Sequence, residues 1–272
     1  MKKQSSFKPF LKWAGNKYRI IERIQRLLPE GRRLLEPFTG SAAVFLNTDY
    51  EHYLLTDNNP DLIHLYQLLQ EQGPDFIGYC KRFFNGKHNT PELYYKRRED
   101  FNKTTDIRKK AALFLYLNRH GYNGLCRYNK KGGFNVPFGR YKQPYFPAAE
   151  MLNFHHKAKN AEFKLSDFST VMEQAQADDV IYCDPPYHPL STSANFTSYS
   201  AGGFNEAQQR QLAELAKACR QRDIPVLISN HNTRFTLDVY SEAQLDRFKV
   251  RRFISCNGKQ RNHAGELLAL FS

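Results

Sequence analysis

The chain of 272 residues lacks several features that would assign it to a common protein class. No apolar run approaches the ~18 residues that a membrane-spanning helix needs, so we expect a soluble protein with no membrane association. The first ten residues are basic and polar, without the charged-then-apolar order of a secretory signal. The cytoplasm is therefore the expected location.

Paired cysteines and several ligand-binding motifs are also missing. The five cysteines lie far apart and include no C-x-x-C pair, which argues against a disulfide framework and against a zinc site. The sequence contains no G-x-G-x-x-G, no G-x-x-x-x-G-K-[ST] and no H-E-x-x-H, the fingerprints of dinucleotide, nucleoside triphosphate and metalloprotease sites. We expect reduced, mostly buried thiols and no metal site.

Acidic residues are scarce in only one part of the chain. The formal net charge is +13, and residues 81–142 contain 16 Lys and Arg against 4 Asp and Glu, whereas the remainder contains 24 against 23. The same segment has 12 Phe and Tyr. Interleaved cations and rings can attract phosphates and stack on bases. The alternative is a solvated basic face over an ordinary aromatic core, but confinement of the charge favours nucleic-acid binding.

Short apolar segments alternate with amphipathic ones, which is typical of a doubly wound α/β domain with a mostly parallel sheet. A helix is expected after the turn at 39–41, and a long one at 206–222. Between about residues 61 and 144 the alternation gives way to helices followed by a loop and hairpin. We therefore expect a catalytic domain of residues 1–60 and 145–272 with an insert at 61–144, and strands at 32–38, 52–57, 161–166, 179–184, 224–230, 244–253 and 266–271, the last two antiparallel.

Asp184, Pro185, Pro186 and Tyr187 directly follow one of the expected strands. The crevice beyond the carboxyl ends of such strands is where doubly wound folds bind ligands. Two prolines fix φ at two positions, so the carboxylate and the ring are held on a stiff turn. Without this context the tetrad would be only a rigid turn; after a strand, it predicts a catalytic site.

The residue types of this tetrad suit attack by an amino nitrogen whose lone pair is delocalised into a base ring. Asp184 and the main-chain carbonyl of Pro185 would accept the two N–H groups and favour a pyramidal nitrogen. An Asp of ordinary pKa ~3.9 is a poor base for an aryl amine, so we assign Asp184 hydrogen bonding and charge stabilisation. Tyr187 offers a ring face to a base flipped out of a duplex. By itself the tetrad predicts methylation of any planar exocyclic amine.

The first expected strand-to-helix turn offers a site for a methyl donor. Gly40 lies where the backbone must approach a ligand closely, and Asp57 ends the next strand, where an acid accepts hydrogen bonds from a ribose. Residues 10–17 add the only Trp, two lysines and a turn. In isolation Trp13 would be an aromatic anchor for the N-terminal segment.

Four segments, 10–17, 35–40, 117–141 and 184–187, resemble the DNA adenine methyltransferase (Dam) family, whose members modify adenine in GATC. The resemblance covers nearly the whole chain, in the family's order of donor site, target-recognition insert and tetrad. It implies a Rossmann-like methyltransferase domain that uses S-adenosylmethionine, and an insert of a small helical bundle plus a β-hairpin that docks in the major groove. Double-stranded DNA is the implied partner, and no obligate protein partner is indicated.

The resemblance also implies roles for individual residues. Arg127 and Leu125 would read the outer base pairs, and Lys12 would contact the first guanine. Tyr122 and Asn123 would fill the space left by the flipped adenine, and Pro137 would touch a thymine methyl. Phosphate contacts would come from Arg98, Asn129 and Arg140, with Tyr141 in the same stretch. The donor site would be lined by Trp13, Lys17, Phe38, Asp57 and Asp184.

Three positions depart from the usual family pattern. Asn16 stands where a second glycine is common, which we attribute to the readiness of Asn to adopt φ > 0. Ala42 stands where the donor loop often has a second glycine, and Asn232 follows His231 where Asp is common.

The sequence therefore predicts an N6-adenine methyltransferase that acts on duplex GATC by base flipping and direct in-line transfer. One alternative keeps the chemistry but changes the target to another DNA sequence, cytosine N4 or RNA. The other is a non-catalytic DNA-binding protein that retains the fold. The insert favours GATC, and the intact Asp184, Tyr187, Trp13 and Asp57 favour an enzyme.

Overall fold

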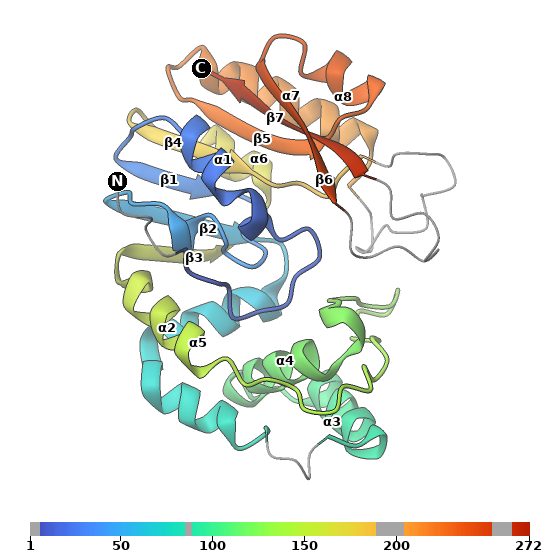
Figure 1. Cartoon of the computed structure of the whole chain (residues 1–272). Helices are drawn as coiled ribbons and strands as arrows, with labels where there is room; N and C mark the ends of the chain where they lie inside the picture. Colours follow the sequence, from blue (N-terminus) through green and yellow to red (C-terminus); the bar gives the residue numbers. More distant parts are fainter. Residues whose placement is uncertain (1–5, 85–88, 189–203, 252–262) are drawn as a thin grey trace.

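The computed structural model describes residues 6–84, 89–188, 204–251 and 263–272, whose strands form one seven-stranded sheet in the order β3-β2-β1-β4-β5-β7-β6 (Figure 1). Within these ranges no helix is both long and apolar enough to cross a membrane. The strands are β1 (Arg33–Glu36), β2 (His52–Asp57), β3 (Ala161–Leu165), β4 (Asp179–Cys183), β5 (Val226–His231), β6 (Gln244–Arg251) and β7 (His263–Phe271).

The strand order reverses between β1 and β4. From β1 the chain continues to β2 and β3 on one side, and from β4 to β5 on the other, with every neighbouring pair among these five strands parallel. β7 lies antiparallel between β5 and β6. The carboxyl ends of β1 and β4 therefore lie side by side at a topological switch point, where such sheets bind ligands. The predicted α/β class is confirmed.

Helices cover both faces of this sheet. Successive strand residues point to opposite faces, so Leu34 and Val180 lie in one buried cluster and Leu35 and Ile181 in the other. Burial on both faces explains the nearly continuous apolar runs in the sequence. The first cluster is covered by α1 (Ile21–Leu27), α2 (Pro60–Lys81) and α5 (Ala148–Lys157), and the second by α6 (Phe168–Glu173), α7 (Glu206–Arg220) and α8 (Arg234–Val239).

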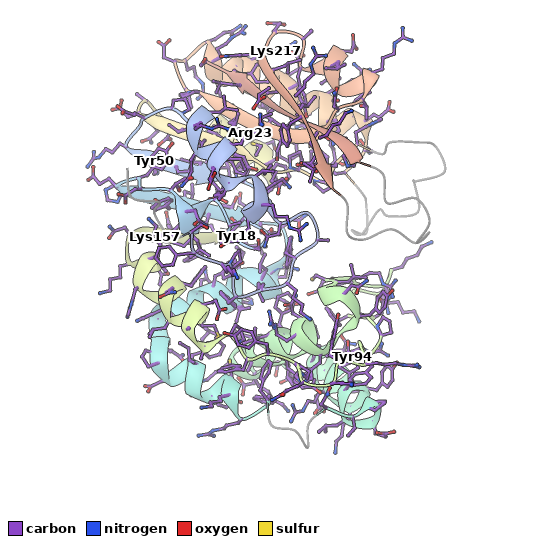
Figure 2. The ribbon with its side chains drawn as sticks, viewed as in Figure 1. Tyr18, Arg23, Tyr50, Tyr94, Lys157 and Lys217 are labelled. Carbon is purple, nitrogen blue, oxygen red and sulfur yellow. The ribbon has the colours of Figure 1, made fainter. Side chains whose placement is uncertain are left out.

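The insert shares the core of the sheet rather than having its own. Its helices α3 (Pro91–Lys103) and α4 (Ile107–His120) lie below the sheet in Figure 1. Their apolar side chains belong to the same buried cluster as Leu34 of β1. Tyr94 of α3, labelled in Figure 2, is fully buried there, and its hydroxyl donates to the Val136 carbonyl at 2.9 Å.

Helix α2 changes direction at Gly73, which has a φ of 44° and is followed by Pro74. Before this kink the helix lies on the sheet, where the Gln67 side chain donates to the carbonyl of Phe163 at 2.8 Å. A Cβ at position 73 would lie 2.6 Å from the ring of His155 in α5, so the close approach requires glycine. Helix α2 thus runs from the sheet towards the helices of the insert. The boundary between catalytic domain and insert at residue 61 stays a prediction.

Residues 121–139 pair as an irregular antiparallel hairpin without regular strands. Isolated bridges join Gly121 to Phe138 and Tyr128 to Phe134. The Asn102 side chain of α3 both donates to the Phe134 carbonyl (3.1 Å) and accepts its N–H (2.8 Å). The predicted hairpin is therefore present as backbone pairing and is bound to α3.

Most predicted strands and the long helix are confirmed apart from small differences at their ends, but two local expectations are wrong. The helix expected after the turn at 39–41 is only the 3₁₀ helix η2 (Phe45–Asn47), because Ala42 has a φ of 58°, which no continuous helix can include. Asn16 has a φ of −48°; its side chain accepts the Tyr18 N–H and begins the 3₁₀ helix η1 (Lys17–Ile20). Residues 252 and 253 of the strand expected at 244–253 lie outside the described residues.

Leu113 of α4, only 1% exposed, tests whether the insert and the sheet unfold together. We expect Leu113→Ala to lower the free energy of unfolding by about 2–5 kcal/mol, because it leaves a cavity in a close-packed core. Far-UV circular dichroism and Trp13 fluorescence should report one transition with the same lowered midpoint. Ile107→Ala, on the same helix but 52% exposed, is the control and should cost less than about 0.5 kcal/mol. Two separate transitions would contradict a shared core.

Candidate active site

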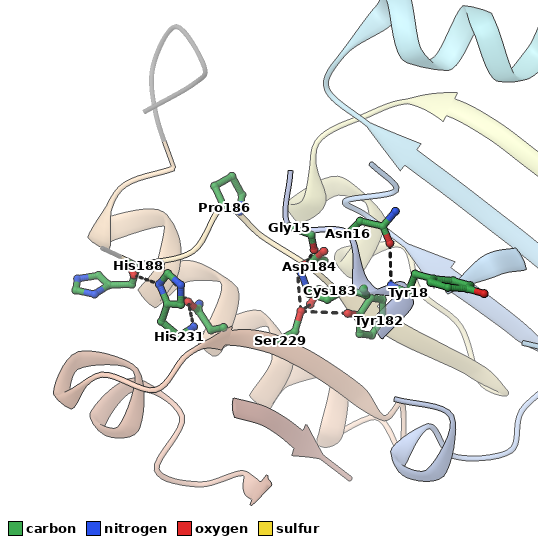
Figure 3. A network of polar contacts seen from close by, with 12 residues as sticks. Gly15, Asn16, Tyr18, Tyr182, Cys183, Asp184, Pro186, His188, Ser229 and His231 are labelled. Carbon is green, nitrogen blue, oxygen red and sulfur yellow. Dashed lines mark hydrogen bonds and ion pairs between the residues drawn. The ribbon is translucent and has the colours of Figure 1, made fainter. Parts of the chain in front are cut away.

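The tetrad begins where β4 ends. All five residues of β4 are buried, and β4 is paired with β1 on one side and β5 on the other. Asp184 leaves the sheet at the switch point, with Pro185 buried, Pro186 exposed and Tyr187 half-buried (Figure 3). The predicted position of the tetrad at the carboxyl edge of the sheet is confirmed.

The carboxylate of Asp184 is held from two sides. Lys17 Nζ lies 2.8 Å from Asp184 Oδ1, and Ser229 Oγ donates to the same oxygen at 2.9 Å. Lys17 is only 6% exposed and also donates to the carbonyl of Gly15. No hydrogen bond from the described part of the chain reaches Asp184 Oδ2. One carboxylate oxygen is therefore fixed, and the other remains available as an acceptor.

Burial and charge set the protonation of this pair. Burial raises the pKa of Asp184, and Lys17 and Ser229 offset this only in part. Burial is the largest single effect and lowers the pKa of Lys17, but Asp184, Tyr182 and Glu266 together outweigh it, so the pKa of Lys17 is raised. Lys17 therefore remains an ammonium at neutral pH and favours negative charge on Asp184.

Tyr187 lies against the same ammonium. Lys17 Nζ is 4.6 Å from the centroid of the Tyr187 ring. The His231 ring meets the Tyr187 ring edge-on, with 4.8 Å between the ring centroids. The buried Tyr187 hydroxyl has no hydrogen-bond partner among the described residues. The ring is thus fixed by its neighbours, and its stacking on a base stays a prediction.

The predicted donor residues Trp13 and Asp57 meet at Gly40. The Gly40 N–H donates to Asp57 Oδ2 at 3.2 Å, and the Asn59 N–H donates to Oδ1 at 3.0 Å. Gly40 has a φ of 48°, and a Cβ there would lie 2.8 Å from Trp13 Nε1. Burial raises the pKa of Asp57 to about 6, against these backbone hydrogen bonds. The turn, the acid and the indole form one cradle at the ends of β1 and β2.

Phe38 lies at the end of β1 within a group of three aromatic rings. Its ring stacks on that of Phe168 of α6, with 5.4 Å between the ring centroids, and meets the Phe204 ring edge-on, with 5.5 Å between the centroids. Glu36, two residues earlier, is 2% exposed, and its Oε1 has no partner among the described residues. Sequence reasoning missed Phe168, Glu36 and Ser229; the signal for Ser229 was a polar residue in an apolar strand next to the tetrad.

The N-terminal loop lies between the donor cradle and the insert. Asn118 of α4 accepts the Lys12 N–H at 2.9 Å and donates to the Lys12 carbonyl at 2.7 Å. Lys12 Nζ lies 3.8 Å from the centroid of the Tyr141 ring, and burial together with Arg119 lowers the pKa of Lys12 to about 8. Beside it is a pocket of about 410 Å³, lined by Lys12, Trp13, Ala14, Asn16, Tyr18, Arg19, Asn123 and Tyr141.

Five of the predicted DNA-contacting residues are exposed on the hairpin and its flanks: Tyr122, Asn123, Asn129, Pro137 and Arg140. The Tyr122 N–H donates to the Pro137 carbonyl at 2.9 Å, and the Asn123 N–H donates to the Tyr141 hydroxyl at 2.9 Å. Tyr122 is 51% exposed, although large aromatic residues are usually buried. The hairpin therefore presents an uncovered ring next to the N-terminal loop.

Asn129 and three less exposed predicted DNA-contacting residues, Arg98, Leu125 and Arg127, have partners within the protein. Arg127 donates from Nε to Asn135 Oδ1 (2.8 Å) and from Nη2 to the Asn135 carbonyl (3.1 Å). Arg98 donates to the Val136 carbonyl at 3.1 Å, and Asn129 Oδ1 accepts two N–H groups at the hairpin tip. Leu125 packs partly buried against the core. These contacts shape the hairpin, and the DNA roles of these residues stay predictions.

Glu36 gives this site a testable pH dependence. Burial raises its pKa from about 4.5 to about 8, against a hydrogen bond from the Phe45 N–H. The native state therefore binds an extra proton between about pH 4.5 and 8, and the free energy of unfolding falls as pH rises through this range. Glu36→Gln is always neutral, so its Tm relative to the wild type should be higher at pH 9 than at pH 5. The exposed Glu30→Gln is the control, and equal differences at both pH values for Glu36→Gln would contradict the raised pKa.

Comparison with known proteins adds to this geometry. Residues 13–254 match the D12 class N6 adenine-specific DNA methyltransferases. DNA adenine methylase of Vibrio cholerae is 54% identical, over 100% of this chain and 98% of that protein. The enzymes of the same name from Escherichia coli (52%; 96% and 94%) and Haemophilus influenzae (48%; 100% and 96%) are also similar. With Asp184 at the switch point beside a glycine turn and an acid, the chain is an adenine-specific DNA methyltransferase and belongs to the D12 class.

Proposed function

We propose that the protein transfers a methyl group from S-adenosylmethionine to N6 of an adenine flipped out of duplex GATC. The observation that carries the proposal is the state of Asp184: Oδ1 is fixed by Lys17 and Ser229, whereas Oδ2 accepts no hydrogen bond from the described residues. A fixed acceptor at the switch point is what an exocyclic amine requires for orientation.

Asp184 acts as a hydrogen-bond acceptor. Its free Oδ2 takes one N6–H and the carbonyl of Pro185 takes the other, so the nitrogen becomes pyramidal with its lone pair directed at the methyl carbon. When bound, S-adenosylmethionine supplies a methyl group already activated by a positively charged sulfur. The Lys17 ammonium favours the anionic form of Asp184, and this anion would stabilise the positive charge that develops on N6. The new N–C bond would form as the bond between the methyl carbon and sulfur breaks, and N6 would then lose one proton to water.

The residues of the cradle fit the proposed donor. Each oxygen of Asp57 accepts one backbone N–H and retains a lone pair for a ribose hydroxyl. The missing Cβ at Gly40 lets the Trp13 indole lie close against the turn, and Phe38 offers an apolar ring at the neighbouring strand end. The unpartnered Oε1 of Glu36 is an acceptor at the same edge of the sheet.

Target recognition is assigned to the hairpin and the N-terminal loop. Arg127 uses Nε and one Nη2 hydrogen for Asn135, which leaves Nη1 and the second Nη2 hydrogen to bind guanine O6 and N7. Tyr122 is exposed on the same hairpin and is proposed to occupy the space of the flipped base. Lys12, held by Asn118, is proposed to contact the first guanine.

The assignment of GATC can be tested on unmethylated plasmid DNA. The purified protein is incubated with plasmid and labelled donor, and the plasmid is then digested by nucleases that differ in sensitivity to N6-methylated GATC. We expect protection at GATC sites. Label in the DNA without such protection would assign the enzyme to another sequence, and no label in any nucleic acid would contradict methyl transfer itself.

Replacing Asp184 tests its role in the chemical step. Asp184→Ala should lower kcat by at least about 10²-fold, the typical effect of removing a group that stabilises charge in a transition state. DNA retention in a gel shift should remain, because the hairpin and its cations are unchanged. Asp238→Ala, at an exposed position of α8, is the control. Full activity of Asp184→Ala would overturn the proposed mechanism.

Substituting two arginines of the hairpin region distinguishes a contact with a base from a contact with a phosphate. Arg127→Ala should cost about 1–3 kcal/mol of discrimination at one base pair, because a bidentate base contact is lost. Arg140→Ala, at an exposed position, should instead weaken binding to all sequences alike and reduce the salt slope by about 1. Affinities for single-substitution duplexes at several salt concentrations measure both. Equal weakening on every sequence by Arg127→Ala would reassign it to a phosphate.

A further inference from the structure

Side chains hold the main chain on both sides of Tyr187. Gln209 of α7 donates from Nε2 to the carbonyl of Pro186 at 2.8 Å. Asn230 of β5 accepts the N–H of His188 at its Oδ1, at 3.1 Å. The stretch from Pro186 to His188 is thus bound by side chains of a helix and a strand that follow it in the sequence.

Tyr240 connects these two side chains. Asn230 Nδ2 donates to Gln209 Oε1 at 3.0 Å and to the Tyr240 hydroxyl at 3.1 Å, and that hydroxyl donates to Gln209 Oε1 at 3.1 Å. The exposed fractions of Gln209, Asn230 and Tyr240 are 1%, 0% and 0%. We call these three residues the polar cluster.

The polar cluster lies in an otherwise apolar layer between the sheet and α7, whose members include Leu212, Ala213 and Ile228. Polar groups in such a layer are unfavourable unless they are hydrogen-bonded. Apolar side chains of the same size would fill this space without that requirement. Packing alone therefore does not explain the polar cluster, whereas its directional bonds to the tetrad backbone do.

Consecutive residues of β5 bind the first residue of the tetrad and the residue that follows its last. Ser229 binds the Asp184 carboxylate, and Asn230 binds the N–H of His188. Because consecutive strand residues point to opposite faces, the tetrad is bound on both faces of the sheet by one strand end. The end of β5 thus fixes the position of the Asp184 carboxylate relative to the Tyr187 ring.

We propose that Gln209, Asn230 and Tyr240 are positioning residues for methyl transfer. They fix the main chain from Pro185 to His188, so that the Pro185 carbonyl and the Tyr187 ring stay aligned with Asp184 Oδ2. The three residues are buried and act through the tetrad rather than on the base or the donor. The inference rests on the proposed roles of Asp184, Pro185 and Tyr187.

Two substitutions test this proposal. Tyr240→Phe removes one hydroxyl, and Gln209→Leu removes the bond to the Pro186 carbonyl with little change in volume. The rate of a single methyl transfer to unmethylated plasmid, at saturating DNA and donor, should fall on the order of 10- to 100-fold, because small displacements of reacting groups have effects of this size. The donor dissociation constant from calorimetry and DNA retention in a gel shift should not change, because neither binding surface is altered.

Tyr53→Phe is the matched control. Tyr53 of β2 is 3% exposed, and its hydroxyl donates to the Thr48 carbonyl at 2.7 Å and accepts the Tyr50 N–H at 2.8 Å. The control also removes a buried hydroxyl with two hydrogen bonds, so it should lower Tm as Tyr240→Phe does but leave the methyl-transfer rate intact. If Tyr240→Phe transfers methyl as fast as Tyr53→Phe, the polar cluster is only structural and the proposal is wrong.

Failure of the positioning role can be distinguished from failure of the proposed methyl-transfer mechanism. Failure of the proposed mechanism appears as full activity of Asp184→Ala. Failure of the present inference appears as wild-type rates in Tyr240→Phe and Gln209→Leu while Asp184→Ala is inactive. If Gln209→Leu does not fold, Tyr240→Phe alone decides, because it retains the ring and its edge-on contact with Phe271.

Discussion

The ion pair between Lys17 and Asp184 determines how the N-terminal loop and the sheet fit together. A charge removed from water is costly unless a partner of opposite charge and further hydrogen bonds accompany it. Lys17 is nearly buried, so its loop must lie over the carboxyl end of β4, where Asp184 and the carbonyl of Gly15 receive the ammonium. The same placement brings Trp13 against Gly40. One buried pair therefore aligns the tetrad with the cradle at Gly40.

The N-terminal loop also connects the catalytic centre to the insert. Asn118 of α4 binds both the N–H and the carbonyl of Lys12, and Tyr141 lies under the Lys12 ammonium. Lys12 and Lys17 thus belong to one short segment that is fixed at one end by the insert and at the other by Asp184. A continuous buried core beneath this segment makes the insert and the sheet one structural unit. The hairpin and Asp184 are therefore held in fixed relation.

Several parts of this arrangement could be predicted from the sequence because they depend on local pattern. Strands buried on both faces have continuous apolar runs, so most strands of the sheet could be predicted from the apolar runs in the sequence. The position of Asp184 followed from its place after such a strand. The helix expected after residue 41 was wrong, because the left-handed conformation of Ala42 depends on the loop around it and has no signal in the residue type. The explanation offered for Asn16, a positive φ, was also wrong, because Asn16 has a negative φ and its side chain caps a 3₁₀ helix.

The sequence by itself determined the α/β class, the confinement of the excess positive charge to the insert, and the stiff turn that carries Asp184 and Tyr187. Only the tertiary structure decided which side chains meet that turn. The family resemblance placed Lys17 in the same site as Asp184, but Ser229 and the polar cluster come from segments far from residue 184 in the chain, and nothing in their spacing predicts their contacts. The order of β1, β4 and β5 brings these segments together. Hydrogen bonds and ion pairs act over about 3 Å, so their partners are set by that order and not by separation along the sequence.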